Sequence, residues 1–197
     1  KKGDFITICG ESGSGKTTLL NLLIGLLKSE YIFCDGKNIS LIKNWQKNIG
    51  YVAQDTYLID DTIKRNIAFG LKDDLIDNNK IKSCLEKSQL LDFTNSLPQN
   101  LETIVGEKGI SISGGQKQRI GVARALYHDP KILVFDEATS SLDVDTETKL
   151  IDSIKKFKGD KTILFVTHRK SVISNCDKVL LLQSGEIKYF GKTKDFY

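Results

Sequence analysis

Apolar and polar positions along the chain follow two alternating patterns. Short continuous apolar runs predict strands at 4–10, 31–34, 48–54, 131–136, 162–168 and 178–182, and 184–191 has the pattern of a hairpin at a sheet edge. Segments with helical length and spacing predict helices at 16–27, 62–67, 78–90 and 144–157, and another that begins at Ser113 or Gly114. Alternating strands and helices predict an α/β fold, and continuous apolar strands indicate a largely parallel sheet because such strands are covered on both faces.

The middle third of the chain differs from the rest. From about 60 to 126, polar helical segments replace the apolar strands. We therefore predict a single domain over 1–197, with a core at 1–58 and 127–197, a helical subdomain inserted at about 59–126, and a small antiparallel β edge. The chain begins without Met and almost directly on its first motif, so we expect the N-terminal part of this domain to be missing.

Composition narrows the function classes. A hydrophobic fraction of 40% supports a substantial core, while the net charge of +4 is mild and its basic residues are spread along the chain. This distribution argues against a nucleic-acid-binding surface. The longest apolar stretch, 19–27, is shorter than the roughly 18–20 residues that span a bilayer. Four widely separated cysteines lack metal-ligand spacing, so we expect reduced thiols in a cytosolic domain.

The segment GESGSGKTT, residues 10–18, carries the first candidate chemistry. It fits G-x-x-x-x-G-K-[ST] and lies between a predicted strand and a predicted helix, the context that the pattern requires. Its glycines would let backbone N–H groups approach phosphate oxygens, Lys16 would reach the β- and γ-phosphates, and the Thr17 hydroxyl would ligate Mg²⁺. The alternative is a glycine-rich turn with an exposed lysine, but the flanking elements favour a P-loop NTPase core.

Polar side chains also stand at the ends of three other predicted strands. Asp136 and Glu137 follow an apolar run, at the strand end where ligands bind in open α/β sheets. Asp136 could hold Mg²⁺ and Glu137 could polarise a water for in-line attack, although an ordinary strand exit is the alternative. Gln54 could contact Mg²⁺ or that water, and His168 could bond a γ-phosphate oxygen. Taken alone, a glutamine at a strand end is usually polar surface, and a histidine there is more often structural.

The stretch ISISGGQKQRIGVARAL, residues 110–126, has the pattern of a helix start. Free N–H groups after Ser113 would make a second anion site at the helix N-terminus. GESGSGKTT, Gln54, this SGGQ stretch, the Asp-Glu pair, SSLD at 140–143 and a strand-end histidine follow one another in this order. This order resembles the nucleotide-binding domain of ABC transporters, over essentially the whole chain.

The resemblance implies ATP and Mg²⁺ as ligands, in a head-to-tail dimer with ATP between one subunit's P-loop and the other's SGGQ helix. One subunit would bind ATP through Gly10, Glu11, Ser12, Gly13, Ser14, Gly15, Lys16, Thr17 and Thr18, and Mg²⁺ through Thr17, Gln54 and Asp136. Its catalytic residues would be Glu137 as the base, His168 as the residue that positions γ-phosphate and water, Lys16 and Gln54. The partner would contribute Ser113, Gly114, Gly115 and Gln116 in trans, and Asp143 would couple the two sites.

The segment TIVGEKG, residues 103–109, narrows the resemblance. It is similar to a segment before the signature of exporter-type ABC proteins that contacts their transmembrane domains, and 49–70 is similarly exporter-like. The implied function is ATP hydrolysis that drives export or flipping of a substrate across a membrane. The implied partners are a second nucleotide-binding domain, as a homodimer because every motif is intact, and transmembrane domains upstream on the same polypeptide. The domain would work at the cytoplasmic face of the inner or plasma membrane, without nucleic acid.

Two other functions stay open from the residues alone. One is a soluble ABC ATPase of DNA repair or translation, which the motif at 103–109 disfavours. The other is a regulatory module that binds nucleotide without hydrolysis, which the intact Glu137, His168 and signature glycines disfavour. The chain also departs from the family pattern, with Ile112 in place of leucine and no Pro-Gly turn at 28–36. Neither the cargo nor the adenine-stacking aromatic residue is specified by this sequence.

Overall fold

The computed structural model describes residues 1–196, and its contacts divide the chain into two compact units. The first unit contains Lys1–Gly50, Pro130–Asp136 and the segment from Lys158 onward. The second contains Tyr51–Asp129 and Glu137–Phe157. Each unit is therefore built from segments that are distant in the sequence.

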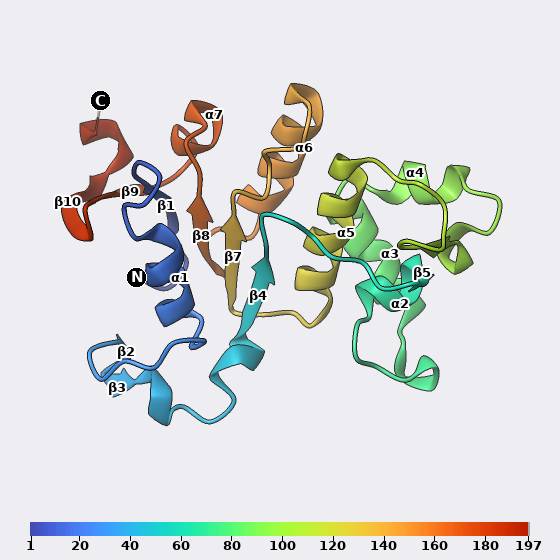
Figure 1. Ribbon diagram of the computed structural model, residues 1–197, viewed down its shortest axis with the longest axis horizontal. Coiled ribbons are helices and arrows are strands. Elements are labelled where there is room, and N and C mark those ends of the chain that lie inside the picture. The colour runs from blue at the N-terminus through green and yellow to red at the C-terminus, as the bar shows by residue number, and fades with distance from the viewer. Residues whose placement is uncertain (197) are drawn as a thin grey trace. The chain divides into compact units, whose positions relative to one another are not determined.

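A six-stranded sheet in the order β10-β9-β1-β8-β7-β4 forms the framework of the first unit (Figure 1). Its strands are β1 (Phe5–Cys9), β4 (Ile49–Val52, which crosses from the first unit into the second), β7 (Ile132–Asp136), β8 (Thr162–Val166), β9 (Lys178–Gln183) and β10 (Glu186–Lys192). Strand β1 pairs in parallel with β8 and β9, and β7 pairs in parallel with β8. Strand β10 pairs antiparallel with β9. The predicted α/β fold with a largely parallel sheet and an antiparallel edge is confirmed.

Both faces of this sheet are apolar. Helix α1 (Lys16–Leu23) covers one face, where the buried cluster contains Ile8, Leu20, Ile24, Val134, Val166 and Leu182. On the other face the rings of Phe135 and Phe165 stack with centroids 4.7 Å apart, and α7 (Lys170–Ile173) packs against β1 and β9 through Ile173, Cys9 and Val179. Packing on both faces explains the continuous apolar strands and holds the strand ends in fixed positions.

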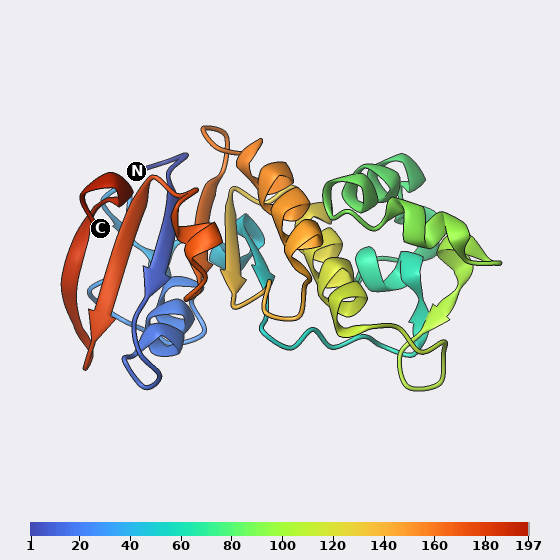
Figure 2. The ribbon, with the colours of Figure 1, turned by 90° about the horizontal axis from the view of Figure 1, so that it is seen from above.

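The second unit is mainly helical (Figures 1 and 2). Its helices are α2 (Ile63–Ile67), α3 (Asn78–Lys87), α4 (Leu91–Ser96), α5 (Gly114–Tyr127) and α6 (Val144–Lys155), and β5 (Asp61–Thr62) pairs antiparallel with β6 (Ile104–Val105). Helix α5 lies between α6 on one side and α2 and α3 on the other (Figure 2). Ile120, Val122 and Ala123 are fully buried in it, so α5 is the core of this unit.

Two predicted elements are wrong in extent. The helix predicted at 16–27 ends at Leu23 because Gly25 adopts φ 77° and the chain turns away, which leaves Leu26 68% exposed. The strand predicted at 31–34 contains only β2 (Phe33–Cys34), which pairs with β3 (Lys37–Asn38) in a hairpin outside the main sheet. Tyr31, which the apolar pattern assigned to a strand, is 88% exposed.

Other predicted boundaries move by a few residues. Strand β4 ends two residues before Gln54 and β8 ends two residues before His168, so both side chains stand on the loops that follow their strands. Helices α4 and α7 were too short to give a periodic signal. Short 3₁₀ helices at Ile39–Leu41, Asp73–Leu75, Asn100–Glu102 and Thr193–Asp195 also lie in stretches without a predicted element, and a fifth at Trp45–Asn48 takes in the first residue of the strand predicted at 48–54. The proposed limits of the helical subdomain, 59–126, stay a prediction.

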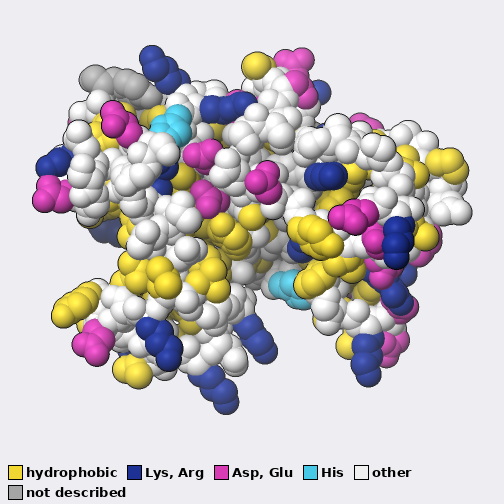
Figure 3. Space-filling model, viewed as in Figure 1, with side chains coloured by type: hydrophobic (Ala, Val, Ile, Leu, Met, Phe, Trp, Pro, Cys, Tyr) yellow, Lys and Arg dark blue, Asp and Glu magenta, His cyan; other side chains and the backbone are white. Residues whose placement is uncertain are grey.

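Charged side chains of both signs cover the surface. On the face shown in Figure 3, Lys and Arg side chains are interspersed with Asp and Glu. Within residues 1–196, none of the helices combines the length and apolar character needed to cross a bilayer. Several large apolar side chains are nevertheless exposed in the second unit, among them Tyr57, Phe69 and Ile104.

Candidate functional site

The loop between β1 and α1 has a backbone that only glycine fits at its first position. Gly10 adopts φ 148°, and a Cβ there would lie 2.2 Å from the Leu182 carbonyl oxygen and 2.7 Å from the Ser14 Oγ atom. Gly13 and Gly15 also have positive φ angles, of 79° and 102°. A Cβ on Gly13 would meet no atom within 4 Å, so this part of the loop borders open space. The glycines thus wrap the backbone tightly and leave room beside it.

Lys16 is the buried cation of this loop. It is only 8% exposed, and its Nζ donates to the Gly10 carbonyl at 2.6 Å and to the Glu11 carbonyl at 2.8 Å. An ammonium group has three N–H donors, so one remains after these two bonds. Both acceptors are neutral carbonyls, which leaves the positive charge of Lys16 available to an anion.

Ser14 supplies a test of whether the loop fits a phosphate. Its side chain is 4% exposed, and within residues 1–196 its Oγ atom has no hydrogen-bond partner. A buried hydroxyl without a partner costs about 1–3 kcal/mol, and a phosphate oxygen would supply the missing acceptor. Helix α1 also has no acidic residue in its first turn, so its N-terminal N–H groups favour an anion. The loop therefore fits a phosphate group.

Two further predicted site residues follow strands at the same edge of the sheet. Asp136 is the last residue of β7 and pairs with Val166 of β8, which pairs with Ile8 of β1, two residues before the loop begins. His168 follows β8 by two residues and is exposed. Because parallel strands end at one edge, the phosphate loop, Asp136 and His168 are brought to that edge within the first unit.

Gln54 and Glu137 belong to the second unit. Glu137 adopts φ 49°, a left-handed conformation that is uncommon for a residue other than glycine and occurs often at functional sites. Its carbonyl accepts from the Ser140 N–H at 3.1 Å, which begins the turn leading to Asp143. Gln54 is exposed on the segment after β4.

The SGGQ stretch is the capped start of α5. The Ser113 Oγ atom accepts from the Gln116 N–H at 3.2 Å, and the Gln116 Oε1 atom accepts from the Ser113 N–H at 2.8 Å. This reciprocal capping box confirms that the stretch is a helix terminus rather than a flexible linker. A Cβ on Gly115 would lie 3.2 Å from the Leu142 Cδ2 atom and 3.3 Å from the Ser141 carbonyl, so the loop before Asp143 packs closely on it.

Asp143 caps the following helix, α6. Its carboxylate accepts from the Thr146 N–H at 2.9 Å. This backbone bond, with a smaller contribution from the Arg119 charge, holds the pKa of Asp143 below its ordinary value of 3.8. The second unit thus brings together the SGGQ helix start and the Asp143 loop, while the first unit brings together Lys16, Asp136 and His168.

Sequence reasoning missed three residues of α5 that contact the Gln54 segment: Gln118, Gly121 and Arg124. Their only sequence signal is a spacing of three residues just after the SGGQ stretch.

Within residues 1–196, no group of three or more His, Cys, Asp or Glu side chains is placed to hold a metal ion. Of the predicted Mg²⁺ ligands, the first unit carries Thr17 and Asp136, a hydroxyl and a single carboxylate that suit Mg²⁺ shared with phosphate oxygens, and the second unit carries Gln54.

Comparison with known proteins gives consistent matches. Residues 1–140 match the family model described as ABC transporter. The ATP-dependent lipid A-core flippase of Idiomarina loihiensis is 40% identical over 190 residues, which cover 94% of this chain and 32% of that protein. The mitochondrial iron-sulfur clusters transporter ATM1 of Kluyveromyces lactis is 41% identical over 195 residues, 96% of this chain and 27% of that protein.

A solved structure matches along nearly the whole chain. It is that of a bacterial Atm1-family ABC exporter with ATP bound, and it superposes with a TM-score of 0.91 at 35% sequence identity. The match covers 99% of this chain and 34% of that chain. The chain therefore spans about a third of the length of the relatives that it matches.

Proposed function

The chain belongs to the ABC transporter family, and on that premise we propose that it is the domain of an exporter that binds and hydrolyses ATP. The observation that carries the proposal is the phosphate loop, in which, within residues 1–196, the buried Lys16 ammonium keeps one free N–H and the buried Ser14 hydroxyl lacks a partner. The triphosphate of ATP offers acceptors and negative charge to both groups.

The first step is binding of the triphosphate. Lys16 neutralises charge on the β- and γ-phosphates, while the backbone N–H groups at the start of α1 bind their oxygens. Thr17, Gln54 and Asp136 are the proposed ligands of Mg²⁺, which would supply further positive charge to neutralise the phosphates when bound. Lys16 is held by two backbone carbonyls, so little reorganisation is needed when the phosphate arrives.

The second step is attack by water. In the proposal Glu137 accepts a proton from the attacking water, Gln54 orients that water, and His168 donates to a γ-phosphate oxygen. The left-handed backbone at Glu137 supports this assignment, because a strained conformation directly after a strand is typical of functional residues.

The third part of the proposal is a second copy of the domain. Helix α5 has no acidic residue in its first turn, and its N–H groups at Gly114 and Gly115, which the capping box does not use, suit a γ-phosphate. We assign that phosphate to the ATP held by the P-loop of a partner copy, with Asp143 at the interface between the two copies. ATP would close this dimer and hydrolysis would open it.

Export itself rests on the relatives. Their names specify a lipid A-core flippase, an iron-sulfur clusters transporter and a leukotoxin translocation protein. These cargoes share little chemistry, so the proposal extends to export and not to a particular cargo. The domain would act on the cytoplasmic side of a membrane, coupled to transmembrane domains of the same transporter.

The test is hydrolysis by the full-length protein with Glu137→Gln. This change keeps the side-chain size but removes the proton acceptor, so we expect the Mg²⁺-dependent ATPase rate to fall by about 10²–10⁴-fold. ATP binding, measured by titration, should be retained, and a closed dimer should accumulate.

The control is Glu102→Gln, because the Glu102 side chain is 63% exposed and, among the described residues, it forms an ion pair with Lys64 alone. Its turnover should match the wild type. Unchanged turnover in Glu137→Gln would remove Glu137 from the role of base. Tight ATP binding by the wild type without Mg²⁺-dependent turnover would instead indicate a regulatory module and overturn the proposed activity.

A further inference from the structure

Three residues on one face of α5 contact the segment that carries Gln54. Gln118, Gly121 and Arg124 are spaced by three residues, so they form a continuous stripe along the helix. The contacts all lie within the second unit. The same helix begins at Ser113, which makes it a direct physical connection between the SGGQ stretch and the Gln54 segment.

Gln118 holds the segment on both sides of Gln54. Its side chain is 3% exposed, its Nε2 atom donates to the Ala53 carbonyl at 2.8 Å, and its Oε1 atom accepts from the Thr56 hydroxyl at 3.3 Å. Breaking these hydrogen bonds would leave a buried amide without partners, which costs more free energy than breaking the bonds of an exposed amide. The two bonds therefore restrain the segment strongly. Gln54 lies between the two anchored residues.

Gly121 lets this segment approach the helix closely. A Cβ at Gly121 would lie 2.5 Å from the Thr56 Oγ1 atom and 2.9 Å from its Cγ2 atom. The next larger side chain, alanine, would therefore push Thr56 outward and lengthen its bond to Gln118. Glycine at this position is required by the contact and not by a turn.

Arg124 fixes the downstream part of the segment. Its guanidinium donates to the Asn66 carbonyl at 2.7 Å, the Asn66 Oδ1 atom at 3.1 Å and the Tyr57 carbonyl at 3.0 Å, and it lies over the Phe69 ring at 5.3 Å. These partners are all neutral, and burial lowers the pKa of Arg124 from its ordinary value. The guanidinium is thus used as a rigid multiple donor rather than as half of an ion pair.

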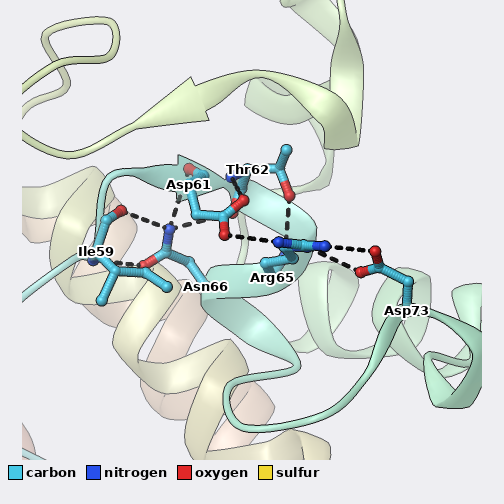
Figure 4. A network of polar contacts seen from close by, with 6 residues as sticks. All are labelled: Ile59, Asp61, Thr62, Arg65, Asn66 and Asp73. Carbon is cyan, nitrogen blue, oxygen red and sulfur yellow. Dashed lines mark hydrogen bonds and ion pairs between the residues drawn. The ribbon is translucent and has the colours of Figure 1, made fainter.

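Asn66 extends this anchor through the turn before α2 (Figure 4). It is fully buried, and its amide donates to the carbonyls of Ile59, Asp61 and Thr62 at 3.0, 3.2 and 3.1 Å. Its Oδ1 atom also accepts from the Ile59 N–H at 3.0 Å. Every donor and acceptor of this side chain is used, so the turn is held as one body with α5.

We propose that Gln118 and Arg124 are positioning residues that fix Gln54 relative to the SGGQ stretch, so that the two motifs move together. The inference rests on the proposed function, in which Gln54 orients the attacking water and the SGGQ stretch binds the partner's ATP. Gln118 lies five positions after Ser113, about 7.5 Å further along the helix axis. When the helix start moves on binding a partner's ATP, the anchor of Gln54 would therefore move with it by nearly the same distance. This shared movement would link dimer closure to catalysis.

The test measures ATP turnover of the full-length protein with Gln118→Met, which keeps the volume and removes both hydrogen bonds. We expect kcat to fall about tenfold while the KM for ATP changes less than about twofold, because Gln54 acts on the water rather than on nucleotide binding. Thr56→Val, which removes only the 3.3 Å bond, should cause a smaller fall in the same direction.

A double-mutant cycle separates positioning from general destabilisation. If Gln118 acts through Gln54, then Gln54→Ala combined with Gln118→Met should be no slower than Gln54→Ala alone. The matched control is Thr94→Val, which removes a buried bond from the Thr94 hydroxyl to the Leu90 carbonyl in the same unit and should leave kcat unchanged. For Arg124→Lys the matched control is Arg65→Lys, whose partly exposed guanidinium is paired with the Asp61 and Asp73 carboxylates rather than with backbone carbonyls of the anchor (Figure 4).

Hydrogen exchange tests the anchor without activity. In the full-length protein, Gln118→Met should speed exchange of the backbone amides at 53–57 by about tenfold, and Thr94→Val should not. Two results would overturn this inference while leaving the proposed function intact, provided that the wild-type protein hydrolyses ATP. One is unchanged exchange at 53–57 in Gln118→Met. The other is a double variant in which the losses of kcat from Gln54→Ala and Gln118→Met add. A wild-type protein without Mg²⁺-dependent turnover would overturn the proposed function and the catalytic role of the anchor with it.

Discussion

At the scale of single residues, the phosphate loop shows how backbone geometry creates a binding site. Gly10 provides a close approach to β9, Lys16 gives two of its three N–H donors to the loop itself, and the Ser14 hydroxyl has no partner among the residues that the structure describes. The loop is thus stabilised internally while keeping a charge and a donor for a ligand. This arrangement favours binding without a large rearrangement.

Gly10→Ala should disrupt both stability and ATP binding. The added Cβ would lie 2.2 Å from the Leu182 carbonyl, so the loop must move, and we expect a loss of about 2–4 kcal/mol in the free energy of unfolding. ATP affinity should fall with it. The measurements are urea unfolding and nucleotide titration of the same samples.

The control for this change is Gly36→Ala. Gly36 adopts φ 77°, but a Cβ there meets no atom within 4 Å, so only backbone strain of about 1–2 kcal/mol is expected. ATP affinity should be unchanged. Equal effects of the two substitutions on ATP binding would show that strain, and not the close contact at the loop, is responsible.

At the scale of elements, the starts of α5 and α6 lie side by side. Gly115 of α5 packs against Ser141 and Leu142, directly before Asp143 caps α6. Both helices thus present capped N-termini in one region of the second unit. The proposed dimer would place this region against the partner's nucleotide.

The cap of α6 predicts a pH dependence. The pKa of Asp143 is lower in the folded state than its ordinary value of 3.8, so the unfolded state binds the proton more readily. The stabilisation is therefore present above pH 3.8 and is lost as the pH falls through the folded pKa. Between about pH 5 and pH 3, the free energy of unfolding should fall more steeply for the wild type than for Asp143→Asn, which keeps a capping oxygen but does not titrate.

Urea unfolding followed by circular dichroism at several pH values measures this difference. Asp145→Asn is a suitable control, because Asp145 lies in the first turn of the same helix and is not its cap. Parallel pH profiles for the wild type and Asp143→Asn would contradict the assigned role of the Asp143 carboxylate in the cap.

At the scale of the whole molecule, the candidate residues fall into two groups. One unit carries the phosphate loop, Asp136 and His168, and the other carries Gln54, Glu137, the SGGQ stretch and Asp143. In the proposed dimer, each ATP would require the P-loop of one copy and the SGGQ helix of the other. A single copy would then contain both halves of a site but use each half with a different partner.

Complementation tests this arrangement. Lys16→Ala removes one half of the composite site and Ser113→Arg removes the other, so each homodimer should be inactive. When the two variants are mixed, half of the dimers are mixed and each has one intact site, so activity should recover to about a quarter of the wild type. The measurement is ATPase activity after co-expression. A mixture of Lys16→Ala and Thr17→Ala, which alter the same half, should stay inactive.

Much of the fold could be predicted because its signals are local. The strands around the phosphate loop and before Asp136 are continuous apolar runs, and these strands occur where expected. The failures have local causes too: 24–27 is apolar but turns at Gly25, and Tyr31 lies in an apolar run yet is exposed because its hairpin stands outside the sheet. The apolar pattern of a segment indicates that the segment tends to be buried. It does not indicate whether another element lies close enough to bury it.

The sequence by itself determined the motif order, the P-loop context and the helix start at SGGQ, because each depends on residues within one or two turns of chain. Only the tertiary structure decided which strands are neighbours, that Ser14 is buried without a partner in residues 1–196, and that Gln118 and Arg124 anchor the Gln54 segment. Gln118 and Ala53 are 65 residues apart, and no local pattern encodes a contact across that separation. Such contacts arise only when helices and strands pack, which is why the residues that link the two motifs were found in the fold and not in the sequence.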